Sequence, residues 1–226
     1  MNKDISTIVF DLDGTLINSA PDLCYALNTT LKEINIPEVP LKEVMGYLGD
    51  GAIELIKRGI SKTNSIENFN TEDLRIRFLE IYNECLLDKT TFYPHVIDSI
   101  KILKKNNFSI AICTNKPEKM AKTIINGLGA NKFFDAITGG DTYKYRKPDP
   151  RHLINTILKT GNSVNKAIMI GDSKNDIDCA KKANIKNIVV NFGYSKIPVK
   201  KLQADHILHD YLDLIDKIKE IKKTQS

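Results

Sequence analysis

The sequence predicts an α/β fold: a doubly wound parallel sheet with an α-helical domain inserted after its first strand. Two observations predict it. Short apolar runs alternate with amphipathic helical segments along most of the chain, and one long helical stretch interrupts that alternation near the N-terminus. Continuous apolar runs are typical of strands that helices cover on both faces, which is the environment of a parallel sheet.

Five apolar runs have the character of buried strands. They are Thr7–Phe10, Ser109–Cys113, Ala136–Thr138, 167–170 and 187–190. Helical periodicity fills the segments between the later runs, for example where Val96, Ile100 and Leu103 recur at spacings of four and three. A further amphipathic helix is expected over 211–221, near the end of the chain.

Residues 17–89 contain helical patterns and no convincing strand. Apolar stripes occur at Leu23, Leu27, Leu31 and Ile34, and again at Leu74, Phe78, Ile81 and Cys85. A shorter helical segment at 52–60 is entered through Gly49-Asp50-Gly51, which we expect to be a specificity loop. We therefore predict a core domain of residues 1–16 and 90–226 and a helical cap of residues 17–89. Because the cap is inserted directly after the first strand, it should cover that strand's carboxyl end as a lid.

Composition excludes several classes of partner. The net charge of +5 is modest and the lysines are dispersed, so no basic stripe for nucleic acid is evident. No apolar stretch has the length of a membrane span, and the polar N-terminus has no apolar signal region. The four cysteines lack metal-ligand or paired spacing, which is typical of reduced packing residues. We expect a cytoplasmic protein that meets neither nucleic acid nor membrane.

Two carboxylates follow the first predicted strand. Asp11 and Asp13 come directly after Phe10, and Gly14 then breaks the strand. Carboxylates are rarely buried unless they are paired or bound to a metal, so this pattern indicates a cation and a reaction. Taken alone, the pattern fits an ordinary Asp-Gly turn about as well.

Polar groups also follow the second and third predicted strands. Thr114-Asn115-Lys116-Pro117 indicates a helix start whose free amides, with the Thr114 hydroxyl and Asn115, suit a phosphate group. A simple helix cap is the alternative. Lys147 precedes two prolines in a stiffened loop, where its ammonium can offset negative charge. The alternative for Lys147 is a solvated loop lysine.

The fourth predicted strand ends in Gly171-Asp172-Ser173-Lys174-Asn175-Asp176. Asp172 follows its strand as Asp11 follows the first, and Asp176 lies four residues later on the same side of a predicted helix. Since the carboxyl ends of parallel strands share one edge of the sheet, the carboxylates should meet there. Oxygen ligands in this number favour Mg²⁺. His206 and His209 have no cysteine partners, so the sequence does not favour zinc.

In this order, Asp-x-Asp-Gly-Thr, strand-end Thr, loop Lys and Gly-Asp-x-x-x-Asp, the chain resembles the haloacid dehalogenase (HAD) superfamily of phosphohydrolases. Further stretches, such as Asn18-Ser19-Ala20-Pro21-Asp22-Leu23 and Gly139-Gly140-Asp141, are similar to its bacterial phosphoglycolate phosphatase branch. The resemblance implies a Rossmann-like sheet with strand order 3-2-1-4-5 and an α-helical cap. One departure is Tyr93-Pro94-His95, where that branch usually has Tyr-Pro-Gly.

The resemblance also implies a mechanism. Asp11 would be the nucleophile that forms an aspartyl-phosphate, and Asp13 the general acid and base. Mg²⁺ would be held by Asp11, the Asp13 carbonyl and Asp172, with Asp176 in support. Thr114, Asn115 and Lys147 would bind the phosphoryl oxygens. The expected substrate is a small phosphorylated metabolite, foremost 2-phosphoglycolate, hydrolysed to glycolate and phosphate by a monomer or homodimer.

Three alternatives stay open. One is a sugar phosphomutase of the β-phosphoglucomutase type, although the stretch of residues 18–22 favours the phosphatase. Another is a phosphatase that acts on pyrophosphate or an amino-sugar phosphate, because the cap sets specificity. The third is a non-catalytic binding module, which should have lost a catalytic acid, whereas Asp11 and Asp13 are both present.

Overall fold

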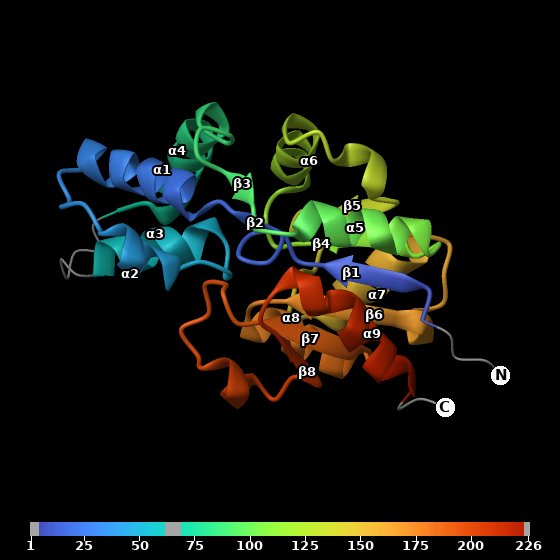
Figure 1. Cartoon of the computed structure of the whole chain (residues 1–226). Coiled ribbons are helices and arrows are strands. Elements are labelled where there is room, and N and C mark those ends of the chain that lie inside the picture. Colours follow the sequence, from blue (N-terminus) through green and yellow to red (C-terminus); the bar gives the residue numbers. More distant parts are fainter. Residues whose placement is uncertain (1–4, 62–68, 224–226) are drawn as a thin grey trace.

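The computed structural model describes residues 5–61 and 69–223. Its core is a parallel sheet with strand order β5-β4-β1-β6-β7-β8 (Figure 1). The strands are β1 (Thr7–Phe10), β4 (Ser109–Cys113), β5 (Ala136–Thr138), β6 (Ala167–Gly171), β7 (Lys186–Val190) and β8 (His206–Leu208). The predicted order of the five strands is confirmed. The edge strand β8 was not predicted, because a run of three residues that begins with histidine has no apolar strand pattern.

Helices cover both faces of the sheet, as the continuous apolar runs predict. Side chains alternate along β1, so Ile8 and Phe10 face one hydrophobic cluster and Val9 the other. The first cluster contains residues of α5 (Val96–Lys105), α6 (Glu118–Gly127) and α9 (Leu214–Lys223). The second contains residues of α7 (Pro150–Lys159) and α8 (Lys174–Lys182). β1 is therefore held at the centre of the domain from both sides.

The last helix begins later than the sequence predicts. Residues Tyr211–Asp213 form a 3₁₀ turn, and α9 starts at Leu214. The Asp210 side chain accepts a hydrogen bond from the Leu212 N–H (2.8 Å), which caps the turn. This local cap fixes the tighter winding before the α-helix continues.

The predicted helical cap consists of α1 (Ala20–Glu33), α2 (Leu41–Met45), α3 (Ala52–Ile60) and α4 (Thr71–Glu84). It lies beyond the carboxyl end of β1, at the left in Figure 1. The short strands β2 (Ile17–Asn18) and β3 (Thr91–Phe92) pair antiparallel and join the two connections between core and cap. The exact boundaries at 17 and 89 stay a prediction, and residues 62–68 of the predicted cap lie outside the described chain.

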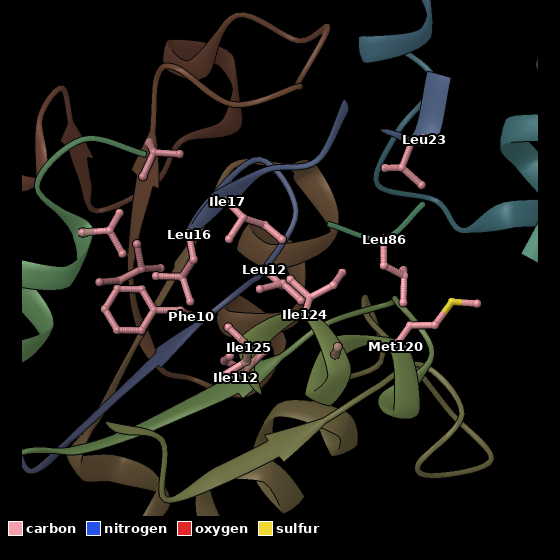
Figure 2. Packing of buried hydrophobic residues seen from close by; sticks show 14 of the residues in the cluster. Phe10, Leu12, Leu16, Ile17, Leu23, Leu86, Ile112, Met120, Ile124 and Ile125 are labelled. Atoms are coloured by element: carbon pink, nitrogen blue, oxygen red, sulfur yellow. The ribbon is translucent and has the colours of Figure 1, made fainter. Parts of the chain in front are cut away.

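One apolar cluster runs from the sheet into the cap. It includes Phe10 and Ile112 of the sheet, Leu12 and Leu16 after β1, and Leu23 of α1 (Figure 2). The cysteines at 24, 85, 113 and 179 are buried and free, as expected of packing residues. In the described part of the chain, no helix has both the length and the apolarity to cross a bilayer.

Candidate active site

The site lies at the carboxyl edge of the sheet, where β1 and β6 end side by side. Asp11 follows β1 directly and its N–H donates to the Ile170 carbonyl (2.8 Å), while Asp172 follows β6 directly. Asp176 is in the first turn of α8, which starts just beyond Asp172. The sheet register thus brings together the three acids that the sequence predicts to be neighbours.

These three acids form a compact buried cluster. One oxygen from each of Asp11, Asp172 and Asp176 lies within 4.8 Å of the others. The Lys147 ammonium lies 2.8 Å from Asp11 Oδ1 and 2.6 Å from Asp176 Oδ1, and its side chain is only 2% exposed. Lys147 is therefore an ion-pair partner inside the site, and the alternative of a solvated loop lysine is excluded.

The acids carry more negative charge than Lys147 balances. Burial, and next to it the charge of Asp176, raises the pKa of Asp11 to about 6 against the opposing effect of Lys147. Burial and the neighbouring carboxylates raise the pKa of Asp172 well above its usual range. Burial alone would lower the pKa of Lys147, but the charges of Asp11 and Asp176 outweigh it and raise that pKa. Such a cluster is stabilised by an added cation.

The donor set fits Mg²⁺. The three buried acids offer carboxylate oxygens, which are the ligands that Mg²⁺ prefers. The Lys147 ammonium beside them balances only part of their negative charge. A bound cation would oppose the effects of burial and of the neighbouring carboxylates, and would lower the pKa of both Asp11 and Asp172. Asp176 already uses both oxygens: Oδ1 accepts from Lys147, and Oδ2 accepts from the Ser173 N–H (3.0 Å) and hydroxyl (2.6 Å).

Asp172 is fixed by a residue far along the chain. The Tyr194 N–H donates to Asp172 Oδ2 (2.7 Å), and the Thr15 hydroxyl lies 3.4 Å from Oδ1. A Cβ atom at Gly193 would lie 2.2 Å from the Asp172 Cβ, so only glycine permits this approach. The loop after β7 therefore orients a predicted metal ligand.

Asp13 occupies a more open place than Asp11. Its side chain is 20% exposed, and both carboxylate oxygens lie 3.0 Å from the ammonium of Lys116. The Ser19 hydroxyl also donates to Asp13 Oδ1. The two acids of the first motif thus have separate lysine partners, Lys147 for Asp11 and Lys116 for Asp13.

The loop after β4 departs in part from the sequence prediction. Thr114 and Asn115 lie at the site, but α6 begins at Glu118 and Pro117 is its N-cap. The amides predicted to be free are partly used: the Thr114 N–H donates to Thr138 O and the Glu118 N–H to Asp141 Oδ1. The expected row of free helix-start amides is wrong to that extent, because strand β5 and the loop after it supply acceptors that the sequence does not reveal.

The Asn115 side chain joins two loops. Its Nδ2 donates to the Lys147 carbonyl (3.1 Å) and to the Gly49 carbonyl (3.3 Å). The predicted specificity loop therefore reaches the core through its backbone. The Asn175 side chain makes a similar bridge, since its Nδ2 donates to Gly49 O (3.2 Å) and to Asp50 Oδ1 (2.8 Å).

A pocket lies between the core and the cap. The core contributes Asp11, Asp13, Thr114, Asn115, Lys116, Pro117, Met120, Lys147 and Ser173 to its lining. The cap contributes Leu23, Leu48, Gly49, Gly51, Ala52, Leu55, Phe78, Leu79 and Tyr82. Among these cap side chains in the described chain, the Tyr82 hydroxyl is the one polar group.

Two site residues were missed by the sequence analysis. Lys116 stands in the recognised Thr-Asn-Lys-Pro stretch, so its position carried a signal, but no role was assigned to it. Tyr82 gave no signal beyond a place next to an apolar helix stripe. Its hydroxyl accepts from the Lys116 ammonium (2.6 Å), a contact across 34 residues of sequence.

Residues 8–190 match the family model of haloacid dehalogenase-like hydrolases. The chain belongs to this family. The phosphoglycolate phosphatase of Agrobacterium fabrum is 36% identical over 207 residues, which cover 91% of this chain and 89% of that protein. The crystal structure of a predicted phosphoglycolate phosphatase from Haemophilus somnus 129pt superposes with a TM-score of 0.87 at 30% identity, covering 96% and 98% of the two chains.

A β-phosphoglucomutase from Clostridium difficile shares the fold, with a TM-score of 0.81 at 21% identity over 98% of each chain. This likeness concerns the fold alone. The family predicted from the sequence, its α/β core with an inserted cap, and the enzyme class of phosphoric monoester hydrolase are confirmed.

Proposed function

We propose that this hydrolase is a Mg²⁺-dependent phosphatase that converts 2-phosphoglycolate to glycolate and phosphate through an aspartyl-phosphate on Asp11. One observation carries the proposal: Asp11, paired with Lys147 at 2.8 Å, and Asp13 line the same pocket under the cap. A nucleophile and a second acid beside one small pocket are what cleavage of a phosphomonoester with a poor leaving group requires.

The roles follow from the two environments. Asp11 attacks phosphorus, and the leaving alkoxide takes a proton from Asp13. Asp13 then accepts a proton from the water that hydrolyses the phosphorylated Asp11. Lys147, the Thr114 hydroxyl and the backbone N–H of Asn115 bind the phosphoryl oxygens, on which negative charge is spread in the transition state. The Asn115 side-chain amide already donates to two carbonyls. Burial of Lys147 supports this role, because an ammonium in a dry site interacts strongly with an anion.

The carboxylates of Asp11 and Asp172 and the carbonyl of Asp13 would hold Mg²⁺, with Asp176 in support. When bound, Mg²⁺ supplies positive charge that lets an anionic phosphoester approach an anionic nucleophile. Asp176 supports the cluster by fixing Lys147 and by capping α8 through Ser173. We also propose residues 17–89 as the cap domain.

The cap wall supports a small leaving group. A sugar would bring several hydroxyls that need hydrogen-bond partners once they are enclosed. The lining side chains of the cap are apolar apart from Tyr82, so they suit a compact leaving group better than a sugar ring. The relatives named as phosphoglycolate phosphatases support the same substrate.

A phosphate-release panel tests the proposal. Purified protein is given 2-phosphoglycolate, glucose 1-phosphate, pyrophosphate and glucosamine 6-phosphate, each with Mg²⁺ and each with excess EDTA. We expect the highest kcat/KM for 2-phosphoglycolate and no turnover with EDTA. Turnover that survives EDTA contradicts the metal requirement, and isomerised sugar phosphate contradicts the phosphatase. A higher kcat/KM for another ester contradicts only the substrate.

A further inference from the structure

Lys116 is a buried cation at the edge of the pocket. Its side chain is 3% exposed, yet it lines the pocket between core and cap. Burying an ammonium costs free energy unless it is paired, so the partners of Lys116 indicate what it can bind. Among the pocket-lining residues of the described chain, Lys116 and Lys147 are the two cations; Lys147 is paired with Asp11 and Asp176 where the phosphoryl group would bind, and Lys116 is paired with Asp13.

The ammonium is fixed from both sides of the pocket. It lies 3.0 Å from each oxygen of Asp13 and donates to the Tyr82 hydroxyl of α4 (2.6 Å). It also lies 4.4 Å from the centre of the Tyr82 ring, within the range of a cation–π contact. Lys116 is therefore held at the place where the proposed general acid meets the cap.

We propose that Lys116 binds the carboxylate of the leaving group and makes the enzyme selective for acidic phosphomonoesters. This inference rests on the proposed function. In 2-phosphoglycolate a single methylene separates the leaving oxygen from the carboxylate. A leaving oxygen that reaches Asp13 thus places the carboxylate within reach of the ammonium that touches Asp13. An ammonium has several donors and can bridge two carboxylates.

Electrostatics gives the same assignment. Without a cation at this point, the substrate's carboxylate would enter a pocket that already holds Asp11 and Asp13, and like charges would repel it. The other nearby cap side chains, such as Leu79 and Phe78, are apolar and offer it no partner. Tyr82 acts as a positioning residue, since its hydroxyl and ring fix the ammonium from the cap side.

The test compares 2-phosphoglycolate with its carboxamide, which has nearly the same shape and no charge on the leaving group. For the wild type we expect kcat/KM to be at least about tenfold higher for the carboxylate, as for a charge-assisted hydrogen bond. In Lys116→Met this preference should vanish, whereas Lys116→Arg should keep part of it. Lys119→Met is the matched control, because Lys119 follows Lys116 closely in sequence, is exposed on α6 and does not line the pocket.

The possible results distinguish the inference from a structural role of Lys116 and from failure of the proposed function. An equal loss of kcat/KM for both substrates in Lys116→Met, with the preference intact, overturns the inference and leaves Lys116 as a partner of Asp13. Should Lys116→Met not fold, as judged by circular dichroism, the wild type alone still decides: no preference for the carboxylate overturns the inference. If the wild type hydrolyses p-nitrophenyl phosphate but neither glycolate derivative, the proposed function fails instead.

Discussion

The two walls of the pocket differ in kind. The core wall presents charged groups on strand ends and short loops, among them Asp11, Asp13 and Lys147. The cap wall presents apolar side chains of helices, such as Leu55 and Leu79, and the backbone of the Gly49–Gly51 loop. On the proposed function, the difference separates two tasks: groups on a rigid sheet edge would perform the chemistry, while an apolar surface would exclude water and select by shape.

Removing the nucleophile from the core wall should have the largest effect. We expect Asp11→Asn to lower the rate of phosphate release at least about 10⁴-fold, because an amide is not a nucleophile and no other lining carboxylate can replace it. The measurement is steady-state phosphate release with Mg²⁺, with circular dichroism to show that the variant folds. A folded variant that keeps more than a tenth of the activity would remove Asp11 from the chemistry.

Behind the core wall, a buried polar group has no ionic partner. His152 of α7 is buried, and neither ring nitrogen has a hydrogen-bond partner among the described residues. Burial lowers the pKa of His152 to about 4, helped by the charge of Lys147. The folded state therefore resists protonation that the unfolded state accepts, and stability should fall as the pH falls from about 6.5 to about 4.

His152→Leu should remove this loss. As the pH falls from 6.5 to 4, the unfolding free energy of the variant relative to that of the wild type should rise by up to about 3 kcal/mol. Urea denaturation over that pH range measures it. If the unfolding free energies of the two proteins depend on pH in the same way, the pKa of His152 is not lowered by folding. The contrast between the paired charges of the site and the unpaired His152 behind it would then be wrong.

A change in the cap wall should alter selection more than chemistry. Leu79→Ala removes part of the apolar lining, so we expect kcat/KM for 2-phosphoglycolate to fall about tenfold and the relative rate for bulkier esters such as phenyl phosphate to rise. Leu74→Ala is the control, because Leu74 is half-buried on the same helix and does not line the pocket. Equal losses for small and bulky esters would show that the cap wall does not select.

Breaking the Asn175 bridge between the two walls should have a smaller effect. Asn175→Ala removes the hydrogen bonds from Asn175 to Gly49 O and Asp50 Oδ1. We expect KM for 2-phosphoglycolate to rise about fivefold with little change in kcat, since the loop is held against the core less often. Lys174→Ala, an exposed neighbour on α8 that pairs with Asp178, should leave KM unchanged. A pure fall in kcat would instead assign Asn175 to the core chemistry.

The smallest effect concerns the connection from the cap back to the core. His95 precedes α5 with φ at +63°, a left-handed conformation that favours glycine, and its side chain is exposed. His95→Gly should raise the unfolding free energy by up to about 1 kcal/mol without changing kcat. Thermal melting measures the first and phosphate release the second. A glycine at this position adopts a positive φ without strain.

The contrast between the walls also marks how far the sequence predicts this molecule. Asp11 and Asp172 were predictable because each directly follows an apolar strand, so a local pattern fixes its place at the sheet edge. Lys147 was predictable from its loop and the family resemblance. These signals require only neighbouring residues and the rule that parallel strands end together.

Long-range contacts were not predictable in this way. Lys116 meets Tyr82, and Asp172 meets the amide of Tyr194, through packing between segments distant in sequence. The acceptors for the amides of Thr114 and Glu118 belong to strand β5 and to the loop after it. Strand β8 forms because β7 offers a free edge, since its three residues alone have no strand pattern.

The central claim is that Asp11, in the core wall, becomes phosphorylated during turnover. It is tested most directly by mixing enzyme, Mg²⁺ and 2-phosphoglycolate, quenching within one turnover, reducing with borohydride and mapping the modified peptide by mass spectrometry. We predict reductive modification of the peptide that contains Asp11, and no modification in Asp11→Asn. Modification at another residue, or none during full turnover, would contradict a covalent intermediate on Asp11.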